Sequence, residues 1–381
     1  MAVYLDNAAT TGVCLEAADA AYNIMTENYG NPSSTHKMGR DAKKALELAR
    51  SQVAAALGAK PEEIFFTSCG TESDNWAILG GAELMKRRGR HIISSRAEHS
   101  AVLKALEQLE TQGYEITRLT PQRDGSISVE SVLEALREDT IMISLMLVNN
   151  ETGGISDISE ISKALKRRGS GALIHTDAVQ GFLKLPFSAK TLGADLISIS
   201  GHKIHAPKGV AALYIKDGVR GALKLKPLIV GGAQESERRA GTEALPQIAA
   251  LGAASALGIE RLSQSQAHIQ ELKNLAVRRL CSENEGLVVL SGSAPHILSI
   301  SLPGHRSETL MNFLEAREIY VSKSSACKKG KRSHVLEAIG LPPELIDGAL
   351  RIGLSRYTTE SEIHALCDGI FEARTSIKTK L

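Results

Sequence analysis

Two charged side chains in this sequence stand where buried strands are expected to end. Asp177 follows the candidate strand 173–176, and Lys203 lies three residues after the candidate strand 196–200. A lysine withdrawn from water has a lowered pKa, and its neutral amine is a nucleophile suited to forming a Schiff base. An acidic side chain nearby can pair with a protonated ring nitrogen. Pyridoxal phosphate requires these two protein groups, so the pair predicts a site for this cofactor.

Other polar residues also follow apolar runs. The segment 67–73, Thr-Ser-Cys-Gly-Thr-Glu-Ser, leads into an expected helix, and hydroxyl residues at a helix N-terminus can hold a phosphate. The same residue types also cap helices for structural reasons alone, so both interpretations stay open. His99 follows another run, where a lone histidine is more often structural. The polar residues 149–151 follow the run 141–148 and need partners, either in the protein or in a ligand.

Short β-rich runs alternate with helical patterns between residues 32 and about 250. The helix expected over residues 41–57 is followed by Gly58 as a C-cap. Such alternation is typical of an α/β domain with a largely parallel central sheet flanked by helices, in which ligands bind at the carboxyl ends of the strands. The expected strands are 64–67, 91–95, 141–148, 173–176, 196–200 and 210–215.

The pattern changes after about residue 255. A long polar helix over roughly 259–279 precedes short strands near 288–290, 297–302 and 318–321, and helices close the chain. This order favours a smaller α+β domain. We therefore expect a large domain over residues 13–255 and a small domain made of residues 1–12 and 256–381.

Composition excludes several classes of protein. The chain has 381 residues, 43% of them hydrophobic, and a formal net charge of +2, which gives no global reason to expect nucleic acid or an anionic membrane as a partner. No signal peptide is expected, and the most apolar run, 141–148, is too short to span a bilayer. The five scattered cysteines contain no CxxC pair, so neither a disulfide framework nor a metal site is expected. We expect a cytoplasmic protein with reduced thiols.

The chain resembles the NifS/IscS-like cysteine desulfurases of the class V aminotransferase group, which have the pyridoxal phosphate fold type I. The matching motifs run in the same order over essentially the whole chain. They are Leu5-Asp-Asn-Ala-Ala-Thr-Thr11, Asn31-Pro-Ser-Ser, Thr67-Ser-Cys-Gly-Thr-Glu-Ser73, Glu98-His99, Asn149-Asn-Glu-Thr-Gly153, Asp177-Ala-Val-Gln180, Ser200-Gly-His-Lys203, Gly231-Gly-Ala-Gln-Glu235, Arg239-Ala-Gly-Thr242, Ser324-Ser-Ala-Cys327 and Arg351-Ile-Gly-Leu-Ser-Arg356.

The resemblance implies a role for each residue around the cofactor ring. Lys203 would hold pyridoxal phosphate as a Schiff base, and Asp177 would pair with the pyridine nitrogen. His99 would stack on the ring and assist proton transfer, and Gln180 would contact the ring hydroxyl. These roles describe a catalytic site that activates an amino acid.

The resemblance also implies how the phosphate is held. Gly70 and Thr71 would bind it from the helix N-terminus, and Ser200 and His202 would bind it from the neighbouring strand end. Thr242 would reach the phosphate of a neighbouring subunit, so a homodimer is expected.

For the substrate, L-cysteine, the resemblance implies a carboxylate site and a sulfur carrier. Asn150, also counted among the cofactor contacts, would grip the carboxylate with Arg356 and Asn7, because an arginine fork suits a carboxylate. Cys327 would attack the substrate sulfur as a thiolate, keep it as a persulfide and leave alanine.

The residues around Cys327 are basic and small. Nearby cations lower a thiol pKa, and Gly330 with the small residues 324–326 suggests a mobile loop. A solvated basic loop with an incidental cysteine is the alternative, and the resemblance favours the catalytic interpretation. The cations are Lys323, Lys328, Lys329, Lys331 and Arg332.

Several alternatives stay open. A selenocysteine lyase would use the same groups, a C–S lyase or aminotransferase would not need the loop thiol, and a non-catalytic scaffold subunit could keep the fold. The sulfur acceptor could serve iron–sulfur cluster assembly, tRNA thiolation or another thio-cofactor route. The segment after Cys327 is shorter than in long-loop members and unusually basic, and we hypothesise that it docks an acidic surface of the acceptor protein.

Overall fold

The computed structural model describes residues 2–218, 221, 223–323 and 332–377. Its main feature is a seven-stranded sheet in the order β2-β8-β7-β6-β5-β3-β4. The strands are β2 (Ile64–Thr67), β3 (His91–Ser95), β4 (Glu115–Leu119), β5 (Thr140–Met146), β6 (Leu173–Asp177), β7 (Leu196–Ser200) and β8 (Ala211–Ile215). Strand β8 runs antiparallel to both of its neighbours, and the other pairs are parallel. The expected α/β architecture with a mostly parallel sheet is confirmed.

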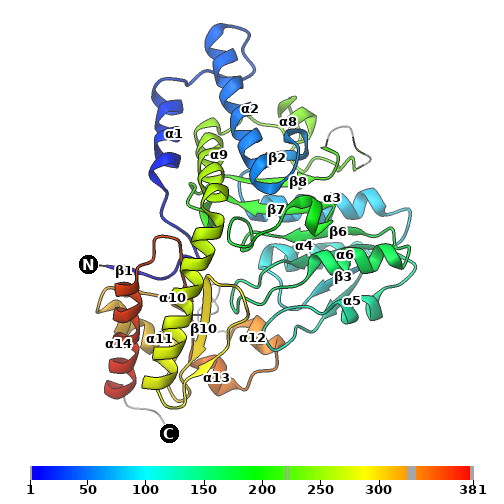
Figure 1. Cartoon of the computed structure of the whole chain (residues 1–381). Helices are drawn as coiled ribbons and strands as arrows, with labels where there is room; N and C mark the ends of the chain where they lie inside the picture. Colours follow the sequence, from blue (N-terminus) through cyan, green and yellow to red (C-terminus); the bar gives the residue numbers. More distant parts are fainter. Residues whose placement is uncertain (1, 219–220, 222, 324–331, 378–381) are drawn as a thin grey trace.

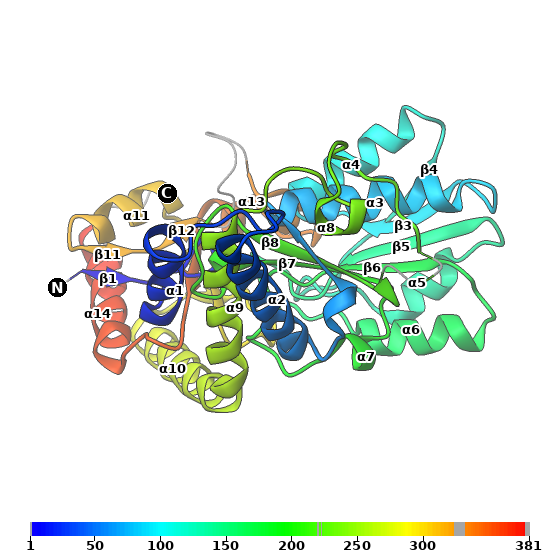
Figure 2. The same ribbon diagram turned by 90° about the horizontal axis from the view of Figure 1, so that it is seen from above.

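Helices cover both faces of this sheet, which explains why its central strands are buried throughout. Every residue of β5, β6 and β7 is buried. Figure 2 shows α3 (Gly70–Met85) and α4 (Ser100–Glu110) on one side and α6 (Ile158–Arg167) and α7 (Ala189–Leu192) on the other. Short α5 (Val129–Ala135) precedes β5. Edge strand β4 was not among the expected strands, because its residues are mostly exposed or half-buried and carry no continuous apolar run.

Helix α2 (Lys37–Leu57) begins four residues before the expected start. The ring of His36 caps it by accepting a hydrogen bond from the backbone N–H of Gly39 (3.3 Å), which the apolar spacing alone did not indicate. The predicted C-cap is confirmed, since Gly58 has a φ of 62°. Helix α2 and α1 (Leu15–Thr26) both pack against α9 (Leu245–Glu260) (Figure 1).

The long helix predicted over roughly 259–279 is α10 (Leu262–Glu283), which begins three residues later and follows directly on a second helix, α9. Helix α9 ends at Glu260, and α10 begins after Arg261, whose φ of −99° and ψ of 5° interrupt the helical path. Figure 1 shows α10 continuing away from the large sheet and along the second group of strands.

A second, four-stranded sheet has the order β12-β13-β10-β9 and is antiparallel. Its strands are β9 (Val288–Val289), β10 (Ile297–Ser301), β12 (Ser322–Lys323) and β13 (Ala349–Gly353). Near it, β1 (Val3–Tyr4) pairs in parallel with β11 (Ile319–Tyr320). The N-terminal strand therefore joins the C-terminal part of the chain, beside α14 (Glu360–Ser376) (Figure 1). The exact domain boundaries stay a prediction.

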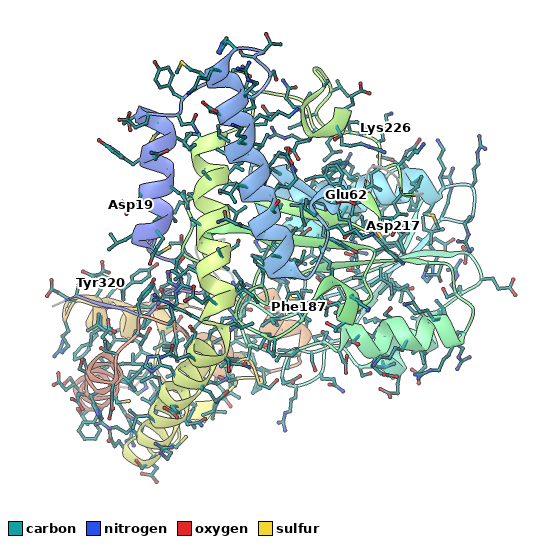
Figure 3. The ribbon with its side chains drawn as sticks, turned by 45° about the horizontal axis from the view of Figure 1, so that its top comes forward. Asp19, Glu62, Phe187, Asp217, Lys226 and Tyr320 are labelled. Carbon is teal, nitrogen blue, oxygen red and sulfur yellow. The ribbon has the colours of Figure 1, made fainter. Side chains whose placement is uncertain are left out.

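The remaining helices are short or lie at the edges. They are α8 (Gln234–Glu237), α11 (Ser307–Glu315), α12 (His334–Ala338) and α13 (Pro343–Asp347). At the rim of the antiparallel pair β2–β8, Figure 3 shows Glu62 near Asp217, where the backbone N–H of Asp217 donates to the Glu63 carboxylate (2.9 Å). Across the described ranges, no helix is long and apolar enough to cross a membrane.

Candidate active site

A cavity of about 680 Å³ lies at the carboxyl ends of the parallel strands, at the border between the two sheets. The position agrees with the rule for ligand sites in α/β sheets. The structure brings most of the predicted site residues together on its wall. These residues are Gly70, Thr71, His99, Asn150, Asp177, Gln180, Ser200, His202 and Lys203.

Lys203 follows β7 through the short 3₁₀ turn η2 (Gly201–Lys203). Its Nζ donates hydrogen bonds to the backbone carbonyl oxygens of Ala8 (2.9 Å) and Ala9 (2.6 Å). Burial, with a further contribution from the charge of Arg351, lowers the pKa of Lys203 to about 8. The neutral, nucleophilic amine is therefore far more populated near neutral pH than in a lysine with an ordinary pKa.

Asp177 is the last residue of β6 and lies on the same cavity wall. Its Oδ1 accepts a hydrogen bond from the backbone N–H of Val179 (2.9 Å). Burial and the nearby carboxyl of Asp74 raise the pKa of Asp177 to about 7, and His99 acts in the opposite direction. A cationic group in the cavity would stabilise the ionised carboxylate.

His99 caps α4, with Nδ1 accepting from the backbone N–H of Ala101 (3.2 Å). The neutral ring therefore carries its proton on Nε2. Gln180 is held by two bonds: its Nε2 donates to the Ala8 carbonyl oxygen (2.8 Å), and its Oε1 accepts from Lys184 Nζ (3.2 Å). These hydrogen bonds fix the side chains of His99 and Gln180, which line the cavity.

The N-terminus of α3 opens toward one end of the cavity at Gly70 and Thr71. A Cβ on Gly70 would lie only 3.2 Å from Val179 Cγ2, so the backbone approaches closely here. Across from it, burial and the charge of Lys203 lower the pKa of His202 to about 4 and keep its ring neutral. Free backbone N–H groups at a helix start suit a phosphate.

These features fit pyridoxal phosphate. The cavity offers a desolvated amine, a buried carboxyl and a helix N-terminus on one wall. Thr242 does not line this cavity within the single chain, and it is exposed. Its expected role toward a neighbouring subunit stays a prediction.

Of the two arginines in the motif 351–356, Arg351 of β13 lines the cavity and Arg356 does not. Arg351 is 3% exposed, and its Nη2 donates to Asp6 Oδ1 (3.2 Å) and Ser322 Oγ (3.0 Å). Its Nη1 donates to the carbonyl oxygen of Asn150 (3.0 Å), and its Nε has no partner among the described residues. Sequence reasoning overlooked Arg351, although a charged residue inside an apolar strand is a recognisable signal.

Arg356 and Asn7 lie off the cavity wall. Nε and Nη2 of Arg356 are buried and have no hydrogen-bond partner in the described part of the chain. Asn7 has a structural contact: its Nδ2 donates to the carbonyl oxygens of Gly353 (2.9 Å) and Tyr4 (3.2 Å). Asn7 thus fastens the N-terminal segment to β13, the strand that carries Arg351.

Three buried acids on or behind the wall were not assigned roles from the sequence. Burial raises the pKa of Asp74 to about 7, that of Glu98 to about 8 and that of Glu151 to about 7. Glu151 accepts a hydrogen bond from the hydroxyl of Ser333, the N-cap of α12. Perturbed carboxyls gathered at one cavity are typical of functional sites.

Comparison with known proteins decides the family. The family profile described as Aminotransferase class-V matches residues 3–366. The chain belongs to the class-V aminotransferase family. A relative named "Cysteine desulfurase IscS", from Methanosarcina thermophila, is 42% identical over 386 residues, covering 100% of this chain and 93% of the relative.

Solved structures agree with this family assignment. One titled "NIFS-LIKE PROTEIN" is 37% identical with a TM-score of 0.92 and covers 99% of this chain and 100% of its own. Another, titled "SspA in complex with cysteine", is 33% identical with a TM-score of 0.81 and covers 93% of this chain and 99% of its own. The resemblance noted from the sequence motifs is confirmed, and pyridoxal phosphate is the cofactor of this class-V member.

Cys327, the predicted sulfur carrier, lies outside the described residues. The same holds for Lys328, Lys329 and Lys331. The two remaining cations of that motif are in ion pairs. Lys323 Nζ lies 2.9 Å from Glu308, and Arg332 Nε lies 2.7 Å from Asp347.

Proposed function

We propose that this chain is a cysteine desulfurase that uses pyridoxal phosphate to convert L-cysteine to L-alanine and passes the sulfur to an acceptor protein. The observation that carries the proposal is the convergence of the Lys203 amine, the Asp177 carboxyl and the Arg351 guanidinium on one cavity. The relative from Methanosarcina thermophila carries the name of this activity. The site residues and the acceptor are part of the proposal.

The cofactor would be held along one wall. Lys203 would hold the aldehyde group, Asp177 would pair with the ring nitrogen, His99 would stack on the ring and Gln180 would contact the ring hydroxyl. When bound, pyridoxal phosphate supplies an electron sink for the bond cleavages at the amino acid. Gly70, Thr71, Ser200 and His202 would hold the phosphate.

The substrate carboxylate is assigned to Arg351 and Asn150. Arg351 has both the position on the cavity wall and an unpaired Nε, while Asp6, Ser322 and the Asn150 carbonyl oxygen fix the plane of its guanidinium. A fixed guanidinium binds a carboxylate with defined orientation. Asn7 supports this arrangement by tying the N-terminal segment to β13.

Proton movement is assigned to Lys203 and His99. With a pKa lowered to about 8, the Lys203 amine can take a proton from the substrate α-carbon and return it to the product. His99 presents Nε2–H toward the cavity, because Nδ1 is occupied by the Ala101 N–H. Its proton can be shared with a developing negative charge on the bound molecule.

Sulfur transfer is assigned to Cys327. Its thiolate forms an S–S bond to the substrate sulfur, the Cβ–S bond of the substrate breaks, and the electron pair stays on the carbon skeleton, which takes up protons to become alanine. Although Cys327 lies outside the described residues, the described chain resumes at Arg332, and Arg332 and His334 line the cavity. That placement supports delivery of a thiol to the bound substrate.

The active form is proposed to be a homodimer. The outer side of α1 exposes Leu15 (78%) and Tyr22, and the segment before α8 exposes Val230 (79%). Figure 3 shows α1, marked by Asp19, on the outside of the molecule. A second copy would cover these apolar side chains, and it would allow Thr242 to reach the partner's cofactor phosphate.

The acceptor is proposed to be a protein of iron–sulfur cluster assembly or of tRNA thiolation. The name IscS of several relatives fits the first route. We place the enzyme in the cytoplasm, in agreement with its five cysteines and the expected reduced state of their thiols.

The test is to treat the purified holoenzyme with limiting L-cysteine in the absence of reductant. Alanine is assayed while peptide mass spectra locate any added sulfur. One sulfur on the Cys327 peptide, matched by alanine and lost in Cys327→Ala, is the expected result. Cys281→Ala serves as the matched control, because Cys281 is an exposed thiol on α10, away from the cavity.

Alanine formed without a Cys327 adduct would show a lyase that does not use the thiol. Turnover of selenocysteine but not of cysteine would show a selenocysteine lyase. A chain that binds the cofactor and converts neither amino acid would contradict the proposed activity.

A further inference from the structure

A group of buried acidic side chains lies beside Asp177, and one of them, Asp74, lines the same cavity. Asp74 on α3 and Glu98 before α4 are each 1% exposed, and His175 on β6 is fully buried. Asp74 Oδ1 lies 3.6 Å from His175 Nε2, and both Asp74 and Glu98 are close enough to Asp177 for their charges to interact. The proposed reaction uses only Asp177 of this group.

A bare, buried oxygen on Asp74 favours a neutral carboxyl. Asp74 Oδ1 has no hydrogen-bond partner among the described residues. The Ser198 hydroxyl acts in the opposite direction and lowers the pKa of Asp74, while it lies 3.0 Å from His175 Nε2, and His175 Nδ1 lies 2.9 Å from Ser144 Oγ. A buried ionised carboxylate needs donors at both oxygens, whereas a protonated carboxyl tolerates one bare oxygen far better.

Among the described residues, no lysine or arginine forms an ion pair with Asp74 or Glu98. Burial lowers the pKa of His175 to about 4, so its ring is neutral at pH 7. Burial raises the pKa of Asp74 to about 7 and that of Glu98 to about 8. Two adjoining buried carboxyls cannot both ionise at low cost, so Asp74 and Asp177 retain a proton between them.

The surroundings decide which carboxyl keeps that proton. Asp177 has a backbone N–H donor from Val179 (2.9 Å), and His99 and Lys203 lie on the cavity side of it. We propose that Asp74 is a positioning residue that carries the proton of this pair, so that Asp177 alone presents a negative charge to the cofactor ring. The proposal rests on the proposed role of Asp177.

Infrared spectroscopy of the cofactor-loaded chain can locate the proton, because protonated and ionised carboxyls have separate carbonyl bands. Labelling aspartate with ¹³C at the side-chain carboxyl separates Asp74 and Asp177 from Glu98. At about pH 6, below the pKa of Asp74, we expect a protonated aspartic acid band that Asp74→Asn removes and Asp177→Asn keeps. The reverse pattern, or a spectrum that neither variant changes, would overturn the proposal.

Cofactor binding to the apo chain gives a second readout. Asp74→Ala removes the buried carboxyl and should weaken binding by about tenfold, while Asp74→Asn should restore most of that loss because its amide is a neutral polar group of the same size. Ser198→Ala should shift the frequency of the Asp74 band without removing it. Equal losses in the two Asp74 variants would mean that the ionised form is needed and would contradict the proposal. Neither readout depends on desulfurase turnover, so failure of the proposed activity would be seen separately.

Discussion

The guanidinium of Arg351 donates to the backbone carbonyl oxygen of Asn150 at 3.0 Å. This bond joins β13 of the small sheet to the loop after β5 of the large sheet, two segments that are distant in the sequence. Because both residues line the cavity, the contact places the proposed carboxylate-binding groups side by side.

We expect Arg351→Lys to lower kcat/KM for L-cysteine by about a hundredfold, mainly through KM, because an ammonium cannot reproduce the planar fork. Arg356→Lys is the matched control, since Arg356 lies five residues further along the chain and off the cavity wall. Steady-state kinetics with both variants checks this. A larger loss in the Arg356 variant would restore Arg356 as the carboxylate ligand.

Borohydride reduction of the holoenzyme should fix the cofactor to the Lys203 peptide. Lys273 is the internal comparison, because burial also lowers its pKa to about 8, yet its Nζ donates to the Gly292 and Ala294 carbonyl oxygens at 2.8 and 2.7 Å. Only a lysine whose amine faces the cavity should form the adduct with the cofactor. Peptide mass spectrometry distinguishes the two, and an adduct at Lys273 would contradict the site.

The rate at which pyridoxal phosphate combines with the apo chain should rise with pH and level off above about pH 8. The reactive form is the neutral amine, and burial lowers the pKa of Lys203 to about 8, so the neutral fraction grows as pH rises through that value. Stopped-flow absorbance across pH 6 to 10 measures the midpoint. A midpoint near about 10.4, the ordinary lysine value, would show that the amine is not desolvated.

Ser333→Ala should both destabilise the protein and slow sulfur transfer. The hydroxyl caps α12 by accepting from the Leu336 N–H (3.1 Å) and also donates to the buried Glu151. Its loss should lower the free energy of unfolding by about 1–3 kcal/mol. Ser128→Ala is the control, because Ser128 caps α5 in the same way (3.2 Å) and lies off the cavity wall. Denaturant unfolding and persulfide formation are measured for both variants. Equal effects of the two variants on sulfur transfer would rule out a role for the hydrogen bond between Ser333 and Glu151.

Neutralising Lys328, Lys329 and Lys331 together should slow sulfur transfer to an acidic acceptor while alanine formation in the presence of a small-molecule thiol persists. The reason is electrostatic attraction between the basic segment and the acceptor, which should also weaken as salt is added. Transfer rates measured for several acceptors test it. Unchanged transfer to all of them would remove the docking hypothesis.

Much of the fold follows from local patterns. Strands β5, β6 and β7 are buried on both faces, so their apolar runs were visible in the sequence, and Gly58 marked the end of α2. Edge strand β4 was missed because most of its residues are exposed or half-buried, so the strand has no continuous apolar run. The start of α2 was missed because a histidine ring replaces the usual capping residue at His36.

The site was predictable where chemistry and chain position coincide. Asp177 ends β6 and Lys203 follows the neighbouring strand β7, and parallel strands bring their carboxyl ends to one edge, so the sequence predicts that the two side chains lie together. Arg351 and Arg356 could not be told apart in this way. They share one motif, and only the direction in which each side chain leaves the backbone separates them.

The sequence by itself determined the layered α/β architecture and the family, and it predicted the residue types proposed to hold the cofactor, because hydrophobic periodicity and motif order are properties of the linear chain. The tertiary structure decided which charges face the cavity, which acids are desolvated, and that Asp74, His175 and Ser198 form one group beside Asp177. Those properties depend on distances between segments far apart in the chain and on the water that packing excludes, and neither is encoded in local spacing.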